Sequence, residues 1–331
     1  MSLSLASVFY CIYAIQLTIS IVLNAIVLWM TSKRKEEYMR KYRILLAHMA
    51  VMCMRASFTF STLQMCVHLR PLAAVITTKG PIPSFLGHSE AAFVVFRILF
   101  SDVPGLICIM SVSYAFAAAY RYMGITHSKV VRNHVTNRSI ICALISVHLL
   151  GFAVTAFGYS GMTWDQQFLL SYFPIGNGHM DFDTLYIGSH FTESPNFLIA
   201  LFFSMGVAVL TIFIVFYCSK KVNDRSRLHE SLMRARTLTA QKLLVRALLI
   251  QAFMPTVLVI PLFIVSVLTL VVDTPPVLEY FSFSLIGWLP VLDPIITIYF
   301  VLPFRRLLLS WMPRFSFSNA NVNRIFYDVC K

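Results

Sequence analysis

The sequence predicts an all-α integral membrane protein built as a bundle of seven transmembrane helices, and three observations support this fold class. Of the 331 residues, 58% are hydrophobic and only 12% are charged, whereas soluble domains carry about 25% charged residues. Seven apolar stretches are long enough to cross the roughly 30 Å hydrocarbon core of a bilayer. The basic residues gather in short clusters between these stretches, as in multi-helix membrane proteins. The net charge of +13 therefore does not indicate a nucleic-acid partner.

Each predicted span is an apolar run bounded by polar or charged residues. The approximate limits are 7–31, 44–69, 91–120, 139–160, 195–219, 243–270 and 277–303. Prolines interrupt the third, sixth and seventh spans, and neighbouring helices can satisfy the backbone groups that such breaks free. We expect residues 1–313 to form one domain that ends in a short amphipathic segment, 304–313, followed by a cytoplasmic tail, 314–331.

The positions of lysine and arginine predict which way the helices run. Twenty-three of the 27 basic residues lie in the loops and tail on one side of the expected bundle, at 32–43, 121–138, 220–246 and from 304 onward. The opposite side carries only Arg70 and Lys79. Because cytoplasmic loops are enriched in these residues, we expect the amino terminus outside and the carboxyl terminus in the cytoplasm.

The sequence contains no pattern that indicates an enzyme, a metal site or a cofactor. Its seven cysteines show neither metal-ligand spacing nor a paired framework. Common catalytic motifs such as the Walker lysine loop, HExxH and GxSxG are missing. We therefore expect neither catalysis nor a bound cofactor.

Several segments resemble those of one receptor family. They are 292-LDPIITIYFVLPFRR-306, 242-KLLVRALLIQAFMP-255, 42-YRILLAHMA-50, 80-GPIPSFLG-87 and 120-YRYMGI-125. Together, and in their order along the chain, they resemble the nematode serpentine chemoreceptors of the Str superfamily, closest to class delta (Srd). The resemblance implies a G-protein-coupled receptor that binds a small odorant or pheromone and activates a heterotrimeric G protein. It also implies a multi-pass protein of the plasma membrane, in the cilia of sensory neurons.

The chain departs from the family pattern at three places. The family's cysteine after the 80–87 segment is missing, and the loop 161–194 has no cysteine to pair with. Cys53 stands where an acid is expected in the second span, and Arg55 follows two residues later. Phe304 replaces the usual tyrosine of the terminal motif. The first departure removes the tether that the family places over its outer vestibule.

The resemblance assigns the coupling and switching roles to two clusters. Arg121, with Tyr120 and Tyr122, ends the third span where rhodopsin-like receptors carry Asp-Arg-Tyr, although no acid precedes it here. The other candidates are the prolines of the sixth and seventh spans with their neighbouring acid: Pro255, Asp293 and Pro294. A second interpretation of Arg121 is a stop-transfer arginine whose side chain reaches the lipid headgroups.

Asp293 would lie at membrane depth, where a carboxylate is costly and usually has a partner. At ~1.5 Å per residue, Asp293 lies ~16 Å inside from Phe304. Arg55 lies ~18 Å inside from Arg43 by the same rule. We therefore predict a buried Arg55–Asp293 ion pair. The alternative is a protonated Asp293, or one bonded to backbone freed by Pro294.

Residues in the outer halves of the spans are candidates for ligand contact. The polar candidates are Asp102 and Arg97, which are five apart and so do not share a helical face. The aromatic candidates are Phe100, Phe253, Phe283 and Trp288. For all six the alternative interpretation is loop hydration or ordinary helix packing. Cys218 and Cys330 are possible palmitoylation sites by position.

The sequence thus predicts a chemosensory receptor whose partners are a small-molecule ligand, a heterotrimeric G protein and membrane lipids. Two alternatives remain open at this stage. One is a seven-helix transporter or channel, although few polar groups line a path across the midplane. The other is an orphan receptor that does not couple. The sequence does not indicate an oligomeric state.

Overall fold

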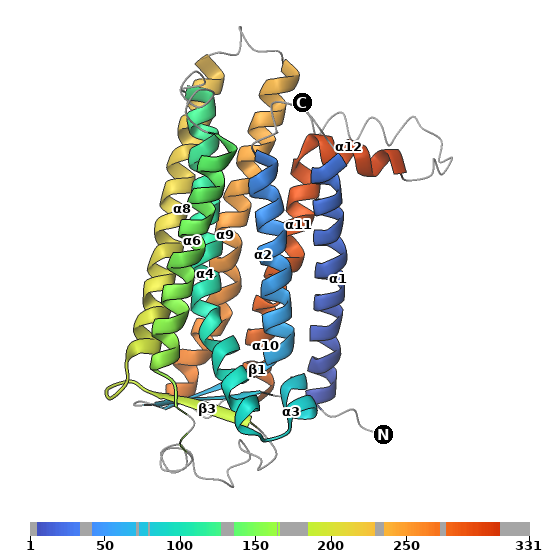
Figure 1. The fold of residues 1–331 in the computed structure, drawn as a ribbon. Helices are drawn as coiled ribbons and strands as arrows, with labels where there is room; N and C mark the ends of the chain where they lie inside the picture. Colours follow the sequence, from blue (N-terminus) through green and yellow to red (C-terminus); the bar gives the residue numbers. More distant parts are fainter. Residues whose placement is uncertain are drawn as a thin grey trace.

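The computed structural model describes residues 5–33, 42–70, 73–78, 80–126, 136–163, 165, 185–228, 235–271 and 276–311. Within these residues, seven helices are long and apolar enough to cross a membrane, which confirms the predicted fold class. The helices stand side by side in one bundle, and the first described helix begins at the end opposite to the one where the last described helix lies (Figure 1).

The first six crossings are single helices, and the seventh is made of two. The crossings are α1 (Leu5–Lys33), α2 (Tyr42–Leu63), α4 (Glu90–Thr126), α6 (Asn137–Ser160), α8 (Asn196–Leu228), α9 (Ala235–Val271), and α10 (Pro276–Ile286) with α11 (Leu289–Phe300). A short helix, α12 (Leu302–Trp311), follows α11 and runs crosswise at one end of the bundle (Figure 1). Phe304 at its start is fully buried among the ends of the helices.

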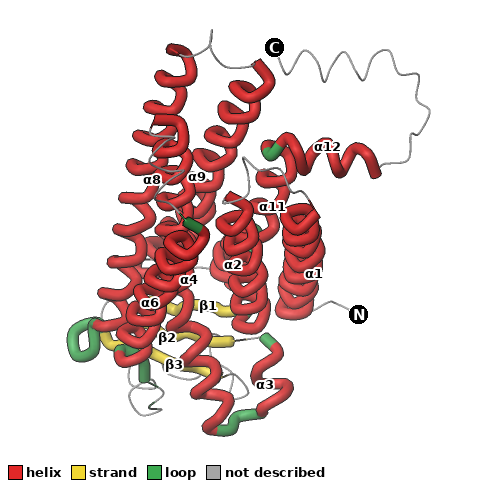
Figure 2. The backbone as a smooth tube through the Cα atoms, turned by 45° about the horizontal axis from the view of Figure 1, so that its top comes forward, coloured by secondary structure: helices red, strands yellow, loops and turns green. Residues whose placement is uncertain are grey.

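A three-stranded antiparallel sheet lies across the other end of the bundle, beside the short helix α3 (Pro81–Leu86) (Figures 1 and 2). Its strands are β1 (Met65–Arg70), β2 (Ala73–Thr78) and β3 (Leu185–His190), with β2 in the centre. We call this end the sheet end and the opposite one the α12 end.

The sheet corrects the predicted limits of the second span, which extended through residue 69. α2 ends at Leu63, and Gln64 takes the positive φ of 39° that turns the chain into β1. The Thr78 hydroxyl donates to the carbonyl oxygen of Leu63, one of the groups left without a partner at the end of α2. The apolar character of 65–69 belongs to a strand and not to a longer helix.

The seventh crossing is interrupted between α10 and α11, and polar side chains of α1 bind the freed backbone. Gln16 Nε2 donates to Ser284 O at 2.9 Å, and Asn24 Nδ2 donates to Pro290 O at 3.1 Å. Ser20 Oγ also donates to Pro290 O at 3.1 Å. The prolines and glycine that break this helix are therefore tolerated because α1 supplies the missing donors.

The interior packs as two main apolar clusters, one toward each end of the bundle. The cluster near the sheet joins strand residues such as Ile76 and Ile187 to Phe96, Phe100 and other helix residues. The cluster near α12 joins the ends of most of the helices.

Candidate functional site: a buried polar junction and the arginines around it

The Asp293 carboxylate is the centre of a buried junction between three helices. The Tyr114 hydroxyl on α4 donates to Asp293 Oδ1 on α11 at 2.6 Å. Gln251 Nε2 on α9 donates to the backbone oxygen of Asp293 at 3.4 Å and to Thr297 Oγ1 at 2.9 Å. All four residues are buried. The third, sixth and seventh crossings are therefore tied together by hydrogen bonds inside the bundle.

Cys53 on α2 also faces this carboxylate. Its side chain is fully buried and interacts with Asp293 through its thiol. Position 53, where an acid was expected, therefore does contact the seventh crossing, but its side chain is a neutral thiol. One carboxylate with a phenol and a thiol as neighbours occupies the junction, instead of two repelling carboxylates.

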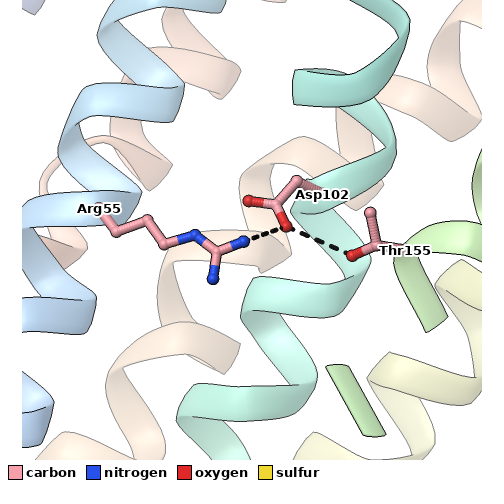
Figure 3. A network of polar contacts seen from close by, with 3 residues as sticks. All are labelled: Arg55, Asp102 and Thr155. Atoms are coloured by element: carbon pink, nitrogen blue, oxygen red, sulfur yellow. Dashed lines mark hydrogen bonds and ion pairs between the residues drawn. The ribbon is translucent and has the colours of Figure 1, made fainter. Parts of the chain in front are cut away.

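The predicted Arg55–Asp293 pair is wrong, because each residue has a different partner. Arg55 Nη2 donates to Asp102 Oδ1 at 2.5 Å, and Thr155 Oγ1 donates to the same oxygen at 3.3 Å. Figure 3 shows this row of contacts crossing from α2 through α4 to α6. Cys53, two residues before Arg55, faces Asp293, and residues two apart on a helix point about 200° apart. Arg55 must therefore face away from the junction.

The Arg55–Asp102 pair lies at an outer edge of the bundle. The Arg55 side chain is 43% exposed, against 11% for Asp102. Val51 and Phe58, one turn to either side of Arg55 on α2, are exposed too. Thr155 approaches because α4 and α6 pack tightly here. A Cβ atom on Gly105 would lie 2.2 Å from Thr155 Oγ1, which is the close packing that small residues allow between membrane helices.

Arg97 is bonded to the backbone and ring of one tyrosine. Its Nε and Nη2 donate to Tyr159 O at 3.1 and 2.8 Å, and its guanidinium carbon lies 3.9 Å from the centre of the Tyr159 ring. Arg97 and Asp102 thus both bond to residues of α6. As expected from their spacing, they do not pair with each other.

The aromatic candidates divide between the interior and the surface. Phe100 stacks on Phe197 of α8 with ring centres 4.9 Å apart, and Phe283 is buried in the same cluster. Trp288 is half-buried at the break in the seventh crossing. Phe253 is 41% exposed, so its side chain lies at the surface of the bundle and not in the interior with Phe100 and Phe283. The neighbouring Gln251 and Ala252 occupy the inner face of α9, which turns Phe253 outward.

Arg121 lies at the α12 end, with its guanidinium stacked on an aromatic ring. Its central carbon is 3.8 Å from the centre of the Tyr42 ring at the start of α2. Its three guanidinium nitrogens are buried, and none has a hydrogen-bond partner in the part of the chain that the structure describes. Tyr120 and Tyr122 are half-buried beside it, and Tyr122 contacts Tyr217 of α8 edge to face. Among the described residues its contact is therefore the ring face of Tyr42, and its N–H groups are donors that suit an anionic or carbonyl acceptor.

Both candidate prolines lie inside helices that meet at the junction. Pro255 is one turn beyond Gln251 on α9, and Pro294 follows Asp293 directly on α11. Cys218 is buried in the cluster near α12, so its thiol is covered by packing in this arrangement, and its palmitoylation stays a prediction. Cys330 lies outside the described residues.

Sequence analysis did not identify the partners that give these sites their geometry. Tyr114 stands in an apolar run and belongs to none of the quoted motifs, whereas Gln251 lies within the quoted 242–255 segment but was not singled out there. Their signal was the same as that of Asp293, a polar side chain at membrane depth, which needs partners at the same depth. Tyr42 belongs to a quoted motif, but its sequence gave no sign that it would meet Arg121.

Seven membrane-spanning helices, with a buried carboxylate joining the third, sixth and seventh and an arginine at the end of the third, have the architecture of a G-protein-coupled receptor. Comparison with protein families agrees: the model of the family described as "Serpentine type 7TM GPCR chemoreceptor Srd" matches residues 8–310, and the chain belongs to this family. A comparison with individual curated proteins found no match. The protein is therefore a multi-pass membrane chemoreceptor of the G-protein-coupled type, from a family of receptors and not of enzymes.

Proposed function

We propose that this receptor binds a small-molecule cue in the half of the bundle near the sheet and activates a heterotrimeric G protein at the α12 end. The cue shifts an existing equilibrium between two arrangements of the helices, in proportion to how much better it binds one of them. The sheet end faces outward and the α12 end faces the cytoplasm, as the distribution of basic residues indicates. The receptor acts in the plasma membrane, in the cilia of sensory neurons.

The observation that carries this proposal is the buried junction at Asp293. It links three helices through hydrogen bonds to the carboxylate and the backbone oxygen of one residue. In a low-dielectric interior, a hydrogen bond lost from such a network leaves a buried polar group unpaired, which costs free energy. Two of these helices contain prolines near the junction. A change in helix packing on the sheet side of the junction is therefore transmitted to the helix packing on its α12 side.

Arg121 supplies the contact with the G protein. It is on the same helix as Tyr114, seven residues and hence ~10 Å further toward the α12 end. In the arrangement described here its guanidinium is buried on Tyr42. We take this arrangement as the resting one, because an arginine covered by the receptor's own side chains does not reach a partner.

Nucleotide exchange on co-expressed nematode Gα subunits tests the proposal. The receptor is compared with Arg121→Ala and with Arg138→Ala, which removes an exposed arginine at the same end of the bundle. A panel of small odorants and pheromones is applied at matched surface levels. We expect exchange from the unmodified receptor and from Arg138→Ala, and its loss in Arg121→Ala.

The same cells distinguish the competing functions. Ionic current or solute flux without nucleotide exchange would show that the protein acts as a channel or transporter and not as a receptor. Equal exchange in Arg121→Ala would leave a receptor whose coupling does not depend on this arginine, and the assigned role of Arg121 would be wrong.

A further inference from the structure

The sheet is packed into the bundle as part of its core. Val75, Ile76, Leu185 and Ile187 are fully buried in β2 and β3. Ile76, Leu185 and Ile187 belong to the same apolar cluster as the stacked Phe100 of α4. In the tilted view of Figure 2 the three strands lie across the end of the bundle. The aromatic interior is therefore covered at this end by hydrogen-bonded strands.

Backbone hydrogen bonds hold this cover together along its length. β2 pairs with β1 from Ala73 to Thr78 and with β3 over the same residues. Thr163 and Gly188 exchange two further bonds of 2.7 Å, which fix β3 to the end of α6. Passage between the strands would require several of these bonds to break at once, without water to replace them on the buried side.

The charged side chains deep in the sheet half of the bundle are engaged away from the aromatic interior. Among the described residues they are Arg55, Arg97 and Asp102, which bond to one another or to Thr155 and Tyr159 of α6. The hydrophobic neighbours of Phe100 and Phe197 form one buried cluster, and the buried Ser101 next to Phe100 adds a hydroxyl but no charge. An ion placed there would lose its hydration without gaining a counter-charge, which is strongly unfavourable.

From the cover and the lining together, we infer that the sheet closes the ligand region to water and that the cue is an uncharged, apolar molecule that enters from the bilayer. The identity of the occupant as a cue rests on the proposed function. The closure does not, since it is a property of the fold. A molecule of this class partitions into lipid first and reaches the Phe100–Phe197 region between helices, where it replaces apolar contacts and no ion pair.

Cysteine labelling in unsealed membranes tests the closure without a known ligand. Phe100→Cys and, separately, Phe197→Cys place a thiol under the sheet. Each is treated with a permanently charged trimethylammonium methanethiosulfonate and with neutral N-ethylmaleimide, and labelling is read at each cysteine by mass spectrometry. Phe85→Cys, at a side chain 85% exposed on α3, serves as the water-facing control. Phe152→Cys, at a side chain 72% exposed on α6 within a span, serves as the lipid-facing control.

We expect the charged reagent to label Phe85→Cys at least 100-fold faster than either interior thiol, while the neutral reagent labels all of them. Gly188→Pro, which removes the N–H that bonds to Thr163, should raise charged labelling of Phe100→Cys at least 10-fold. The charged reagent must leave the buried Cys53 unlabelled in each variant, as evidence that the bundle remains folded.

Three results would overturn the inference. They are charged labelling of the interior thiols within 10-fold of Phe85→Cys, an interior thiol that neither reagent reaches, or a Gly188→Pro variant with unchanged protection. Each can occur whether or not the receptor couples to a G protein, so this inference and the proposed function fail separately.

Discussion

Arg55 donates to Asp102 at 2.5 Å, and this ion pair joins α2 to α4 at an outer edge of the bundle. Because Arg55 pairs with Asp102, the polar neighbours of Asp293 are the phenol of Tyr114, the thiol of Cys53 and the amide of Gln251. The two carboxylates at membrane depth therefore have different tasks. Asp102 neutralises a cation near the lipid, whereas Asp293 holds three helices together in the interior. Variants at the two sites should behave differently.

Asp102→Asn should destabilise the receptor without altering its ligand-independent signalling. Breaking a buried ion pair costs about 3–5 kcal/mol, and the exposure of Arg55 reduces this to about 1–3 kcal/mol. Thermal unfolding in lipid nanodiscs measures the change. Glu193→Gln, which neutralises an exposed acid at the sheet end, is the matched control and should change stability by less than about 0.5 kcal/mol.

Swapping the charges of Arg55 and Asp102 tests more directly whether the two side chains interact. The double variant Arg55→Asp with Asp102→Arg should recover at least half of the stability that either single reversal loses, because the charges remain complementary. Reversal of Arg55 together with Asp293 should recover nothing. Strictly additive losses in the first pair would show that the contact contributes no net energy.

Tyr114→Phe should raise ligand-independent nucleotide exchange and lower stability. The substitution removes the hydroxyl that donates to Asp293 and keeps the ring, so the loss is one hydrogen bond to a carboxylate, about 1.5–3 kcal/mol. Since that bond exists in the arrangement described here, its loss shifts the population toward other arrangements. Basal exchange at matched surface expression provides the measurement.

Tyr217→Phe is the control for Tyr114→Phe, because it removes a hydroxyl from an exposed tyrosine of α8. It should leave both stability and basal exchange unchanged. A Tyr114→Phe receptor that is less stable but has an unaltered basal rate would reduce the junction to a structural role.

Tyr42→Leu should also raise basal exchange, whereas Tyr42→Phe should not. The ring face of Tyr42 stabilises the buried Arg121 guanidinium, and such a contact contributes about 0.5–2 kcal/mol when it is shielded from water. Phenylalanine keeps the face and leucine removes it. We expect the leucine variant to signal several-fold more without ligand. Equal rates in the two variants would mean that the ring does not restrain Arg121.

The sequence was sufficient for the helical bundle and for the positions of Asp293 and Arg121, since Asp293 stands in a motif within a long apolar run and Arg121 in one at the end of another. It was not sufficient to pair the buried charges. Counting residues gives depth along a helix but not the direction of a side chain around it. Arg55 and Asp293 were placed at similar depth, yet Arg55 lies on the opposite side of α2 from Cys53, which faces Asp293.

The sheet could not be predicted for a different reason. Residues 65–70 are apolar enough to continue α2, and a short apolar run does not by itself distinguish a strand from a helix. What makes β1 a strand is its place in a sheet whose third strand, β3, is far along the chain. Such long-range pairing leaves no local signal.

Gly287→Ala should destabilise the seventh crossing, and shortening Gln16 should relieve the effect. Gly287 lies in the break between α10 and α11, and a Cβ atom there would lie 2.4 Å from Gln16 Oε1. Gln16 cannot move away freely, because its Nε2 donates to Ser284 O. Overpacking of this kind costs about 1–3 kcal/mol, which thermal unfolding of the receptor in nanodiscs resolves.

Gly206→Ala is the control, since a Cβ atom at Gly206 on α8 would meet nothing within 4 Å. The double variant Gly287→Ala with Gln16→Ala removes both the clash and the hydrogen bond. It should be more stable than Gly287→Ala alone if the clash dominates, because the lost bond accounts for only about 0.5–1.5 kcal/mol. If the double variant were instead less stable than both single variants, the two losses would be independent, and the conflict with Gln16 would not be the cause of the Gly287→Ala effect. The role of Gly287 would then be to give the backbone room to bend.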